Sequence, residues 1–120
     1  SSYARESYSS IGPTHGPGGS LSGGRAKPRI AGFSNVDTWA YGPGVFNGTS
    51  AATPHVAGAA ALVRYAFPAY TPLQVMQFLE GRAVDQGAGG YDYSYGAGRL
   101  NLGAAPDVQR GLPFLLLLQN

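Results

Sequence analysis

The chain has 120 residues, enough for one modest domain, and its apolar content of 43% supports a packed core. It contains no cysteine, which excludes structural disulfides and cysteine-based zinc sites. The net charge of +2 is scattered, and the tightest basic group (Arg25, Lys27 and Arg29) is shorter than a stripe that tracks phosphates, so no nucleic-acid partner is expected.

The N-terminal third of the chain is predicted to be mostly irregular. A brief strand is expected near residues 7–10, and a loop over residues 11–27, where glycine, proline and serine are dense. An extended segment follows around residues 29–33, because Pro28 disfavours helix for the residue before it and apolar residues lie just beyond. The opening SSYARESYSS shows no signal-peptide pattern, and the missing initiator Met hints at a processed or partial chain.

Two helices are predicted in the middle of the chain. The first covers about residues 51–66, and its body HVAGAAALVRYA is apolar on nearly every face, which is typical of a helix surrounded on all sides. The second begins at Pro72 after Thr71, which forms a T-x-x-Q capping box with Gln74, and Gly81 is its expected stop.

The second helix is predicted to bury one face and expose the other. Gln77 and Glu80 are expected to face water. The buried face consists of apolar side chains that we interpret as core and not as a binding site: Leu73, Val75, Met76, Phe78 and Leu79.

The C-terminal region is predicted to hold turns and short extended pieces. Tyr91, Tyr93 and Tyr95 alternate, so they would line one face of a strand, and we expect them to pack against the first helix. Residues 99–102 give a final extended piece. The apolar run LPFLLLL, residues 112–118, is too short for a bilayer span of roughly 20 residues, so we expect it to dock on the core and not to enter a membrane.

The run NGTSAATPHVAG, residues 47–58, carries the chemistry. Gly48 lets the chain turn sharply without a Cβ in the way. Ser50 then falls at the start of the helix, where backbone N–H groups have no intrahelical partner and would meet an oxyanion formed beside it. The two alanines that follow leave room for a substrate chain, and Pro54 in or near the first turn costs little stability.

The same run matches, unbroken over GTSAATPHVAG, the pattern G-T-S-x-[AS]-x-P-H-V-A-G around the nucleophile of the subtilisin-like (S8) serine protease family, which this sequence therefore resembles. The flanking runs SSIGPT, KPRIAG and YGAGRLNLGAA arrive in the family's order. The resemblance implies an α/β fold: the C-terminal portion of a three-layer structure with a parallel sheet and a buried central helix, incomplete as given. Residues 1–110 would be the C-terminal part of the catalytic domain, and residues 111–120 an apolar tail of unknown role. One departure is Arg29, where the family usually carries an acidic residue.

The resemblance makes Ser50 the catalytic nucleophile of a serine endopeptidase that acts by Ser-His-Asp acyl transfer. In subtilisins the Asp and His precede the Ser along the chain. The 49 residues before Ser50 contain no Asp-Ser/Thr-Gly or His-Gly-Thr-His run, and the Asn of the family's oxyanion hole is absent as well. The chain is therefore expected to be a fragment, inactive by itself, whose partner is the missing N-terminal part of the catalytic domain.

No residue of the chain is a convincing replacement for the missing base. His55 lies five helical positions after Ser50, about 140° around the helix and more than a turn along it, and the resemblance makes it the structural His of the motif. His15 with Asp37 could in principle complete a triad, but we interpret both as solvated loop residues. The α/β-hydrolase elbow G-x-S-x-G fails because Ala52 stands where it needs glycine.

Further expectations follow from the resemblance alone. The substrate would be a polypeptide, the enzyme would be secreted, and the chemistry would need no cofactor. The intact enzyme could bind structural calcium, and Asp85 and Asp92 border a glycine-rich turn, although isolated acids in turns are usually just solvated and we assign no metal ligand here. The alternative is a catalytically inactive pseudoprotease or a binding or scaffold fragment. A chain of 120 residues cannot easily surround so apolar a helix, so exposed apolar surface is expected.

Overall fold

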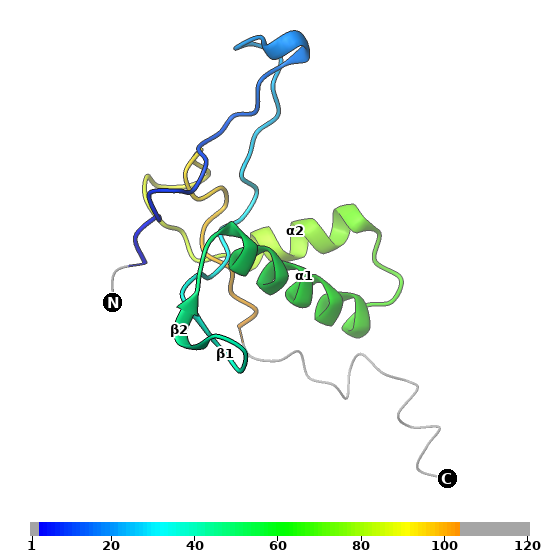
Figure 1. The fold of residues 1–120 in the computed structure, drawn as a ribbon. Helices are drawn as coiled ribbons and strands as arrows, with labels where there is room; N and C mark the ends of the chain where they lie inside the picture. Colours follow the sequence, from blue (N-terminus) through cyan, green and yellow to red (C-terminus); the bar gives the residue numbers. More distant parts are fainter. Residues whose placement is uncertain (1–2, 104–120) are drawn as a thin grey trace.

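The computed structural model describes residues 3–103 (Figure 1). Within them, two strands and two α-helices follow one another: β1 (Val36–Thr38), β2 (Gly42–Phe46), α1 (Thr49–Ala66) and α2 (Pro72–Arg82). The predicted α/β class is confirmed, in an arrangement that is incomplete by itself. In this part of the chain, no helix has the length and hydropathy needed to cross a membrane. The boundary predicted at residue 110 and the apolar run 112–118 lie outside the described residues.

Helix α1 follows its prediction closely. It starts at Thr49, two residues earlier than expected, with Gly48 as its N-cap. At the other end, the Phe67 amide donates to the Val63 carbonyl at 2.8 Å, and proline at the next position cannot continue the ladder. The run of small residues after the GTS motif therefore forms one continuous helix.

Helix α2 begins as predicted and ends one residue later than predicted. Its capping box is complete: the Gln74 amide donates to Thr71 Oγ1 at 3.3 Å, and the Thr71 amide donates to Gln74 Oε1 at 2.8 Å. The prediction that Gly81 stops the helix was wrong. Gly81 does not adopt a left-handed conformation, and the chain leaves the helix only after Arg82.

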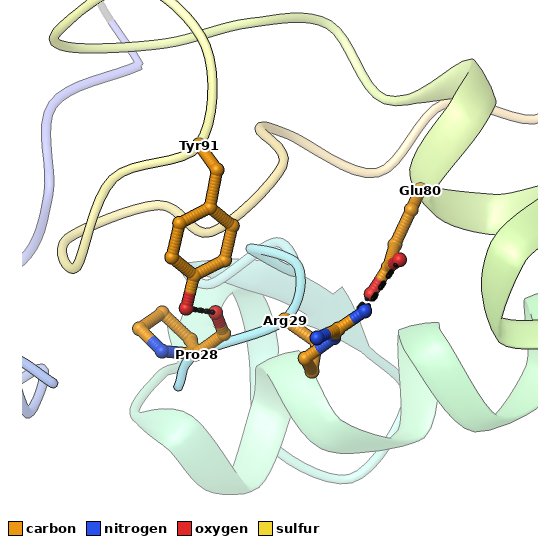
Figure 2. Close-up of polar contacts among 4 residues, drawn as sticks. All are labelled: Pro28, Arg29, Glu80 and Tyr91. Atoms are coloured by element: carbon orange, nitrogen blue, oxygen red, sulfur yellow. Dashed lines mark hydrogen bonds and ion pairs between the residues drawn. The ribbon is translucent and has the colours of Figure 1, made fainter. Parts of the chain in front are cut away.

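The two faces of α2 differ in part from the prediction. Leu73 is 56% exposed and does not join the core, whereas Gln77 is exposed as expected. Glu80 is not turned to open water, because its carboxylate binds the Arg29 guanidinium (Figure 2). The remaining predicted core residues are buried or half-buried: Val75, Met76, Phe78 and Leu79.

The core lies where α1 and α2 pack together (Figure 1) and includes one residue of the final extended segment. Its buried side chains are small or branched: Ala59, Val63, Val75, Leu79 and Leu100. Aromatic rings close the core near the connection between the helices, where Phe67 stacks on Tyr70 with ring centroids 4.7 Å apart and meets Phe78 at 5.5 Å. Burial of one valine or leucine side chain is worth about 1.5–3 kcal/mol, so this cluster is what holds the two helices together.

One face of α1 remains uncovered by the described residues. Leu62 and Tyr65 are 60% and 65% exposed, and Ala57, Gly58 and Ala61 beside them are exposed too. A helix that is apolar all round is therefore packed on one side only. The prediction of exposed apolar surface is confirmed, and a contiguous apolar patch of this kind marks an interaction surface or an aggregation liability.

Extended segments from distant parts of the chain meet at Arg99. Its amide and carbonyl pair with those of Val84 at 2.8 and 2.9 Å in an antiparallel bridge. On its other side, Arg99 forms a parallel bridge with Ala31. The extended pieces predicted at residues 29–33 and 99–102 are thus confirmed. The bridge between Arg99 and Ala31 is the one parallel pairing within residues 3–103.

The β1–β2 hairpin is an element for which no prediction was made. Val36 pairs with Phe46 and Thr38 with Gly42, with an irregularity between the two pairs. Two glycines and a proline within or beside these positions weaken the strand pattern, because both residue types are depleted in strands. The hairpin leads directly into α1 (Figure 1), so it sets the approach of the chain to Ser50.

The N-terminal region agrees with the prediction of a loop but not with that of a strand. Residues 11–27 form an excursion away from the helices (Figure 1), with one 3₁₀ turn at Pro17–Gly19. The strand expected near residues 7–10 was wrong, because the Ser9 amide donates to the Glu6 carbonyl at 3.0 Å and closes a turn instead.

The tyrosines predicted to line a strand surround a turn instead. Asp92 pairs with Gly96, so the chain reverses between them. The Tyr91 and Tyr93 rings meet edge to face at 5.9 Å, and the Tyr91 hydroxyl donates to the Pro28 carbonyl at 2.9 Å (Figure 2). The prediction of a strand packed against α1 was wrong, because the Asp92 carboxylate accepts nearby backbone amides and holds them in the turn.

Candidate active site

Ser50 is the second residue of α1, and its side chain is exposed. The N-cap Gly48 has φ 98° and ψ 173°, a conformation that favours glycine. Its carbonyl accepts the amides of Ala51 and Ala52 at 3.0 and 3.3 Å. The Ser50 amide, in contrast, donates to no acceptor within residues 3–103. An oxyanion formed beside Ser50 would meet this available donor at the positive end of the helix dipole.

Neither the amide nor the carbonyl of Ser50 takes part in the hydrogen bonds between successive turns of α1. Pro54 lies in the second turn, slightly further along than the sequence suggested, and it is the residue whose amide would have donated to the Ser50 carbonyl. The Thr49 carbonyl is bound by the Thr53 hydroxyl at 2.8 Å. The first turn carries no acidic side chain that would oppose a negative charge on the substrate.

His55 is tied to its own helix. Its Nδ1 lies 2.8 Å from the Ala51 carbonyl oxygen, which can only accept, so the proton of this hydrogen bond is on Nδ1. The ring also packs edge to face against Phe33 with centroids 6.0 Å apart. These contacts agree with the interpretation of His55 as a structural residue of the motif.

Two hydroxyl groups that sequence reasoning missed meet the chain just before Ser50. The Gly48 amide donates to Tyr8 Oη at 3.1 Å and to Ser34 Oγ at 3.0 Å, and the two hydroxyl oxygens lie 2.8 Å apart. Tyr8 is 40 residues and Ser34 14 residues away from Gly48 in sequence. No periodicity or spacing could have linked them to the motif.

A cleft of about 280 Å³ opens beside the start of α1. Its lining includes Tyr8, Thr49 and Arg99. The Arg99 guanidinium lies 4.2 Å from the centre of the Tyr3 ring and 5.8 Å from that of Phe33, a cation–π arrangement. The cleft is large enough for a side chain of a bound peptide and adjoins the predicted nucleophile.

The structure does not bring His15 and Asp37 together with Ser50. His15 is exposed in the excursion of residues 11–27, whereas Asp37 belongs to β1. The Asp37 carboxylate accepts the Gly44 amide at 2.7 Å and thus serves the hairpin. Their interpretation as residues outside any triad is consistent with these positions.

The two acids near the glycine-rich turn bind backbone amides. Asp85 Oδ2 accepts the Gly90 amide at 2.7 Å. Asp92 Oδ1 accepts the Tyr95 and Ser94 amides, both at 2.7 Å, and these bonds, with the Tyr95 bond the stronger influence, lower the pKa of Asp92. Within the described part of the chain, no group of three or more His, Cys, Asp or Glu side chains could hold a metal ion.

Comparison with known proteins gives matches to subtilisin-like proteases. The sequence model of the Subtilase family matches residues 1–98. Subtilisin from Bacillus pumilus and subtilisin E from Bacillus subtilis (strain 168) are each 50% identical over 62 residues, which are 52% of this chain but 22% and 16% of those proteins. Fervidolysin from Fervidobacterium pennivorans is 40% identical over 80 residues, 67% of this chain and 11% of its own length.

A solved structure is also similar. The psychrophilic subtilisin-like protease from the Antarctic Pseudoalteromonas sp. AS-11 aligns with a TM-score of 0.46 at 42% identity, over 48% of this chain and 13% of that one. The chain thus spans less than a quarter of the length of the relatives it matches. The family match nevertheless covers most of the chain and includes the GTSAATPHVAG run. The chain belongs to the Subtilase family.

Proposed function

We propose that this chain is the nucleophile-bearing C-terminal part of a subtilisin-like serine endopeptidase. The observation that carries the proposal is the exposed Ser50 at the start of α1, inside an unbroken GTSAATPHVAG run. Membership of the Subtilase family supports serine-type peptidase chemistry. The available Ser50 amide supplies one donor of the oxyanion hole that such chemistry requires.

The proposed reaction begins when Ser50 Oγ attacks the scissile carbonyl carbon. As the C–O bond forms, the hydroxyl proton passes to a histidine held by an aspartate, and the carbonyl oxygen becomes an oxyanion. The Ser50 amide and an asparagine hold that oxyanion. The C–N bond then breaks, the histidine returns the proton to the leaving amine, and water releases the acyl group from Ser50.

The histidine, aspartate and asparagine come, in this proposal, from an N-terminal part of the catalytic domain. His55 is bound to its own helix and His15 lies in the excursion of residues 11–27, so neither serves as the base. The uncovered face of α1 around Leu62 and Tyr65 is apolar, as a surface that packs against further parts of a domain would be.

The rest of the proposal follows from the family. The substrate is a polypeptide, and the working location is extracellular. The acyl transfer needs no cofactor, whereas structural calcium belongs to the intact enzyme and involves no ligand that we assign in this chain.

The proposal is tested with the coding sequence upstream of Ser1. We expect it to encode Asp-Ser/Thr-Gly and His-Gly-Thr-His segments, and the chain joined to that segment should hydrolyse casein. Ser50→Ala should abolish hydrolysis, while Ser22→Ala, a change at an exposed serine outside the motif, should leave it unchanged. Upstream sequence without these segments, or a joined chain that does not hydrolyse casein, would favour the alternative of an inactive pseudoprotease or scaffold. Hydrolysis that survives Ser50→Ala would show that Ser50 is not the nucleophile.

A further inference from the structure

We propose that Tyr8 and Ser34 are positioning residues for Ser50: their hydroxyl groups fix the Gly48 peptide and thereby orient the Ser50 amide toward the oxyanion. The inference rests on the proposed peptidase function for its catalytic consequence. Its geometric part stands on hydrogen bonds of this chain alone.

The Gly48 amide is the centre of a three-membered polar cluster. It donates to Ser34 Oγ at 3.0 Å and to Tyr8 Oη at 3.1 Å, both within the normal range for an N–H···O bond. The two hydroxyl oxygens are 2.8 Å apart, so one hydroxyl donates to the other while both accept from Gly48. A three-centre bond of this kind restricts the rotation of the donor peptide more than one acceptor would.

The segments that carry the two hydroxyls are linked to each other by a further hydrogen bond. Asn35, next to Ser34, has φ 55°, and its side-chain amide donates to Glu6 Oε1 at 2.9 Å. Glu6 belongs to the turn that carries Tyr8, since its carbonyl accepts the Ser9 amide at 3.0 Å. The contact between Asn35 and Glu6 therefore joins the two segments that present the hydroxyls.

Both polar groups of Gly48 are thus occupied, whereas the amides of Thr49 and of the nucleophile Ser50, which follow it, donate to no acceptor within residues 3–103. The Gly48 carbonyl accepts the amides of Ala51 and Ala52, so the peptides on either side of the N-cap are fixed. The Ser50 amide lies between these anchored groups and has no acceptor within residues 3–103. Its direction is set by the anchors. A misplacement of 1 Å in a catalytic group can cost about 100-fold in rate, so loosening the anchors should slow the chemical step.

The first test measures the anchor directly, by amide hydrogen exchange and ¹⁵N–¹H chemical shifts of the whole 120-residue chain. Tyr8→Phe and Ser34→Ala should each speed exchange of the Gly48 amide. The double variant should speed it by roughly tenfold or more, because one hydroxyl substitutes in part for the other. The Ser50 amide resonance should shift in the same variants. Tyr65→Phe and Ser22→Ala, which remove hydroxyls from exposed positions on α1 and in the excursion of residues 11–27, should change neither signal.

The second test measures the catalytic consequence in the chain joined to its upstream segment. Loss of one hydroxyl should lower kcat for a peptide substrate by roughly three- to tenfold, the factor that one hydrogen bond is worth, with KM nearly unchanged. Ser34→Thr keeps a hydroxyl and should restore most of the rate. A merely structural role would lower the amount of folded enzyme and leave kcat per active site unchanged.

The outcomes separate the two proposals. If the joined enzyme is inactive, the peptidase function fails, and the Gly48 exchange rate still decides whether the hydroxyls hold the turn. If the enzyme is active but the double variant keeps its kcat, Tyr8 and Ser34 are not positioning residues. Unchanged Gly48 exchange in the double variant would overturn the inference whatever the activity.

Discussion

The Arg29 guanidinium binds the Glu80 carboxylate through two parallel hydrogen bonds, Nε to Oε1 at 2.5 Å and one terminal nitrogen to Oε2 at 2.8 Å (Figure 2). The hydrogen bond to Glu80 raises the pKa of Arg29 above its ordinary value. This pair ties the extended segment of residues 29–33 to α2. It also gives a role to the one position where the sequence departs from the family's usual acidic residue.

Removal of this ion pair should destabilise the chain slightly. The two side chains are 37% and 17% exposed, so solvent screens the pair, and we expect Arg29→Ala or Glu80→Gln to lower the free energy of unfolding by about 0.5–1 kcal/mol. Arg29→Asp should cost more than Arg29→Ala, because it faces Glu80 with a like charge, and added salt should reduce the difference. Urea unfolding measures all three. Arg25→Ala is the control at an exposed arginine, and an Arg29→Asp variant as stable as the parent chain would refute the role of the pair.

A side chain at the N-cap of α1, Gly48, should destabilise the chain. Gly48 has φ 98°, and although a Cβ there would meet no atom closer than 3.7 Å, the backbone conformation itself is strained for any other residue. Gly48→Ala should therefore lower the free energy of unfolding by about 1–3 kcal/mol. Gly58→Ala is the matched control, because Gly58 lies inside α1 in open space and alanine there should stabilise the helix by up to about 1 kcal/mol. Thermal unfolding in which both variants move in the same direction would contradict this account.

The uncovered face of α1 should make the isolated chain self-associate. Leu62 is 60% exposed on that face, so Leu62→Glu should reduce self-association in sedimentation experiments without loss of helix content. Val63, the next residue, is 3% exposed, and Val63→Glu should unfold the chain because it buries an unpaired charge. Equal self-association of the parent chain and Leu62→Glu would show that this face is not the cause.

The turn at Asp92 should weaken in acid. Because backbone amides lower the pKa of Asp92 below its ordinary 3.8, the folded state binds the proton less readily than the unfolded state does. The stabilisation is present above the unfolded pKa and is lost as the pH falls through the lower folded pKa. The difference in stability between the parent chain and Asp92→Asn should therefore shrink below about pH 4. Circular dichroism at a series of pH values measures it, and a difference that grows on acidification would have the wrong sign.

Local sequence signals predicted most of what is local in this fold. The capping box of α2 needs residues only three apart, Thr71 and Gln74, and it is present in full. The start of α1 and the exposed apolar surface also followed from the motif and the composition of one helix. Gly81 failed as a stop signal because glycine ends a helix only where the backbone turns left-handed, and here it does not.

Long-range features of the candidate site could not be predicted in this way. Tyr8 and Ser34 reach Gly48 from 40 and 14 residues away, through single hydroxyl groups that leave no periodic pattern. The Arg29–Glu80 pair joins residues 51 apart. Glu80 therefore looked like a water-facing residue of α2, because its own helix carries no sign of the partner.

The most direct measurement of the central claim is the labelling of the isolated 120-residue chain by a fluorophosphonate probe, compared with Ser50→Ala. Ser50 is exposed at the start of α1, but neither histidine of the chain is placed to accept its proton. We predict labelling no faster than that of Ser50→Ala for the isolated chain, and strong labelling at Ser50 once the upstream segment is joined to it. Rapid labelling of the isolated chain that disappears in Ser50→Ala would contradict the claim that its catalytic machinery is incomplete.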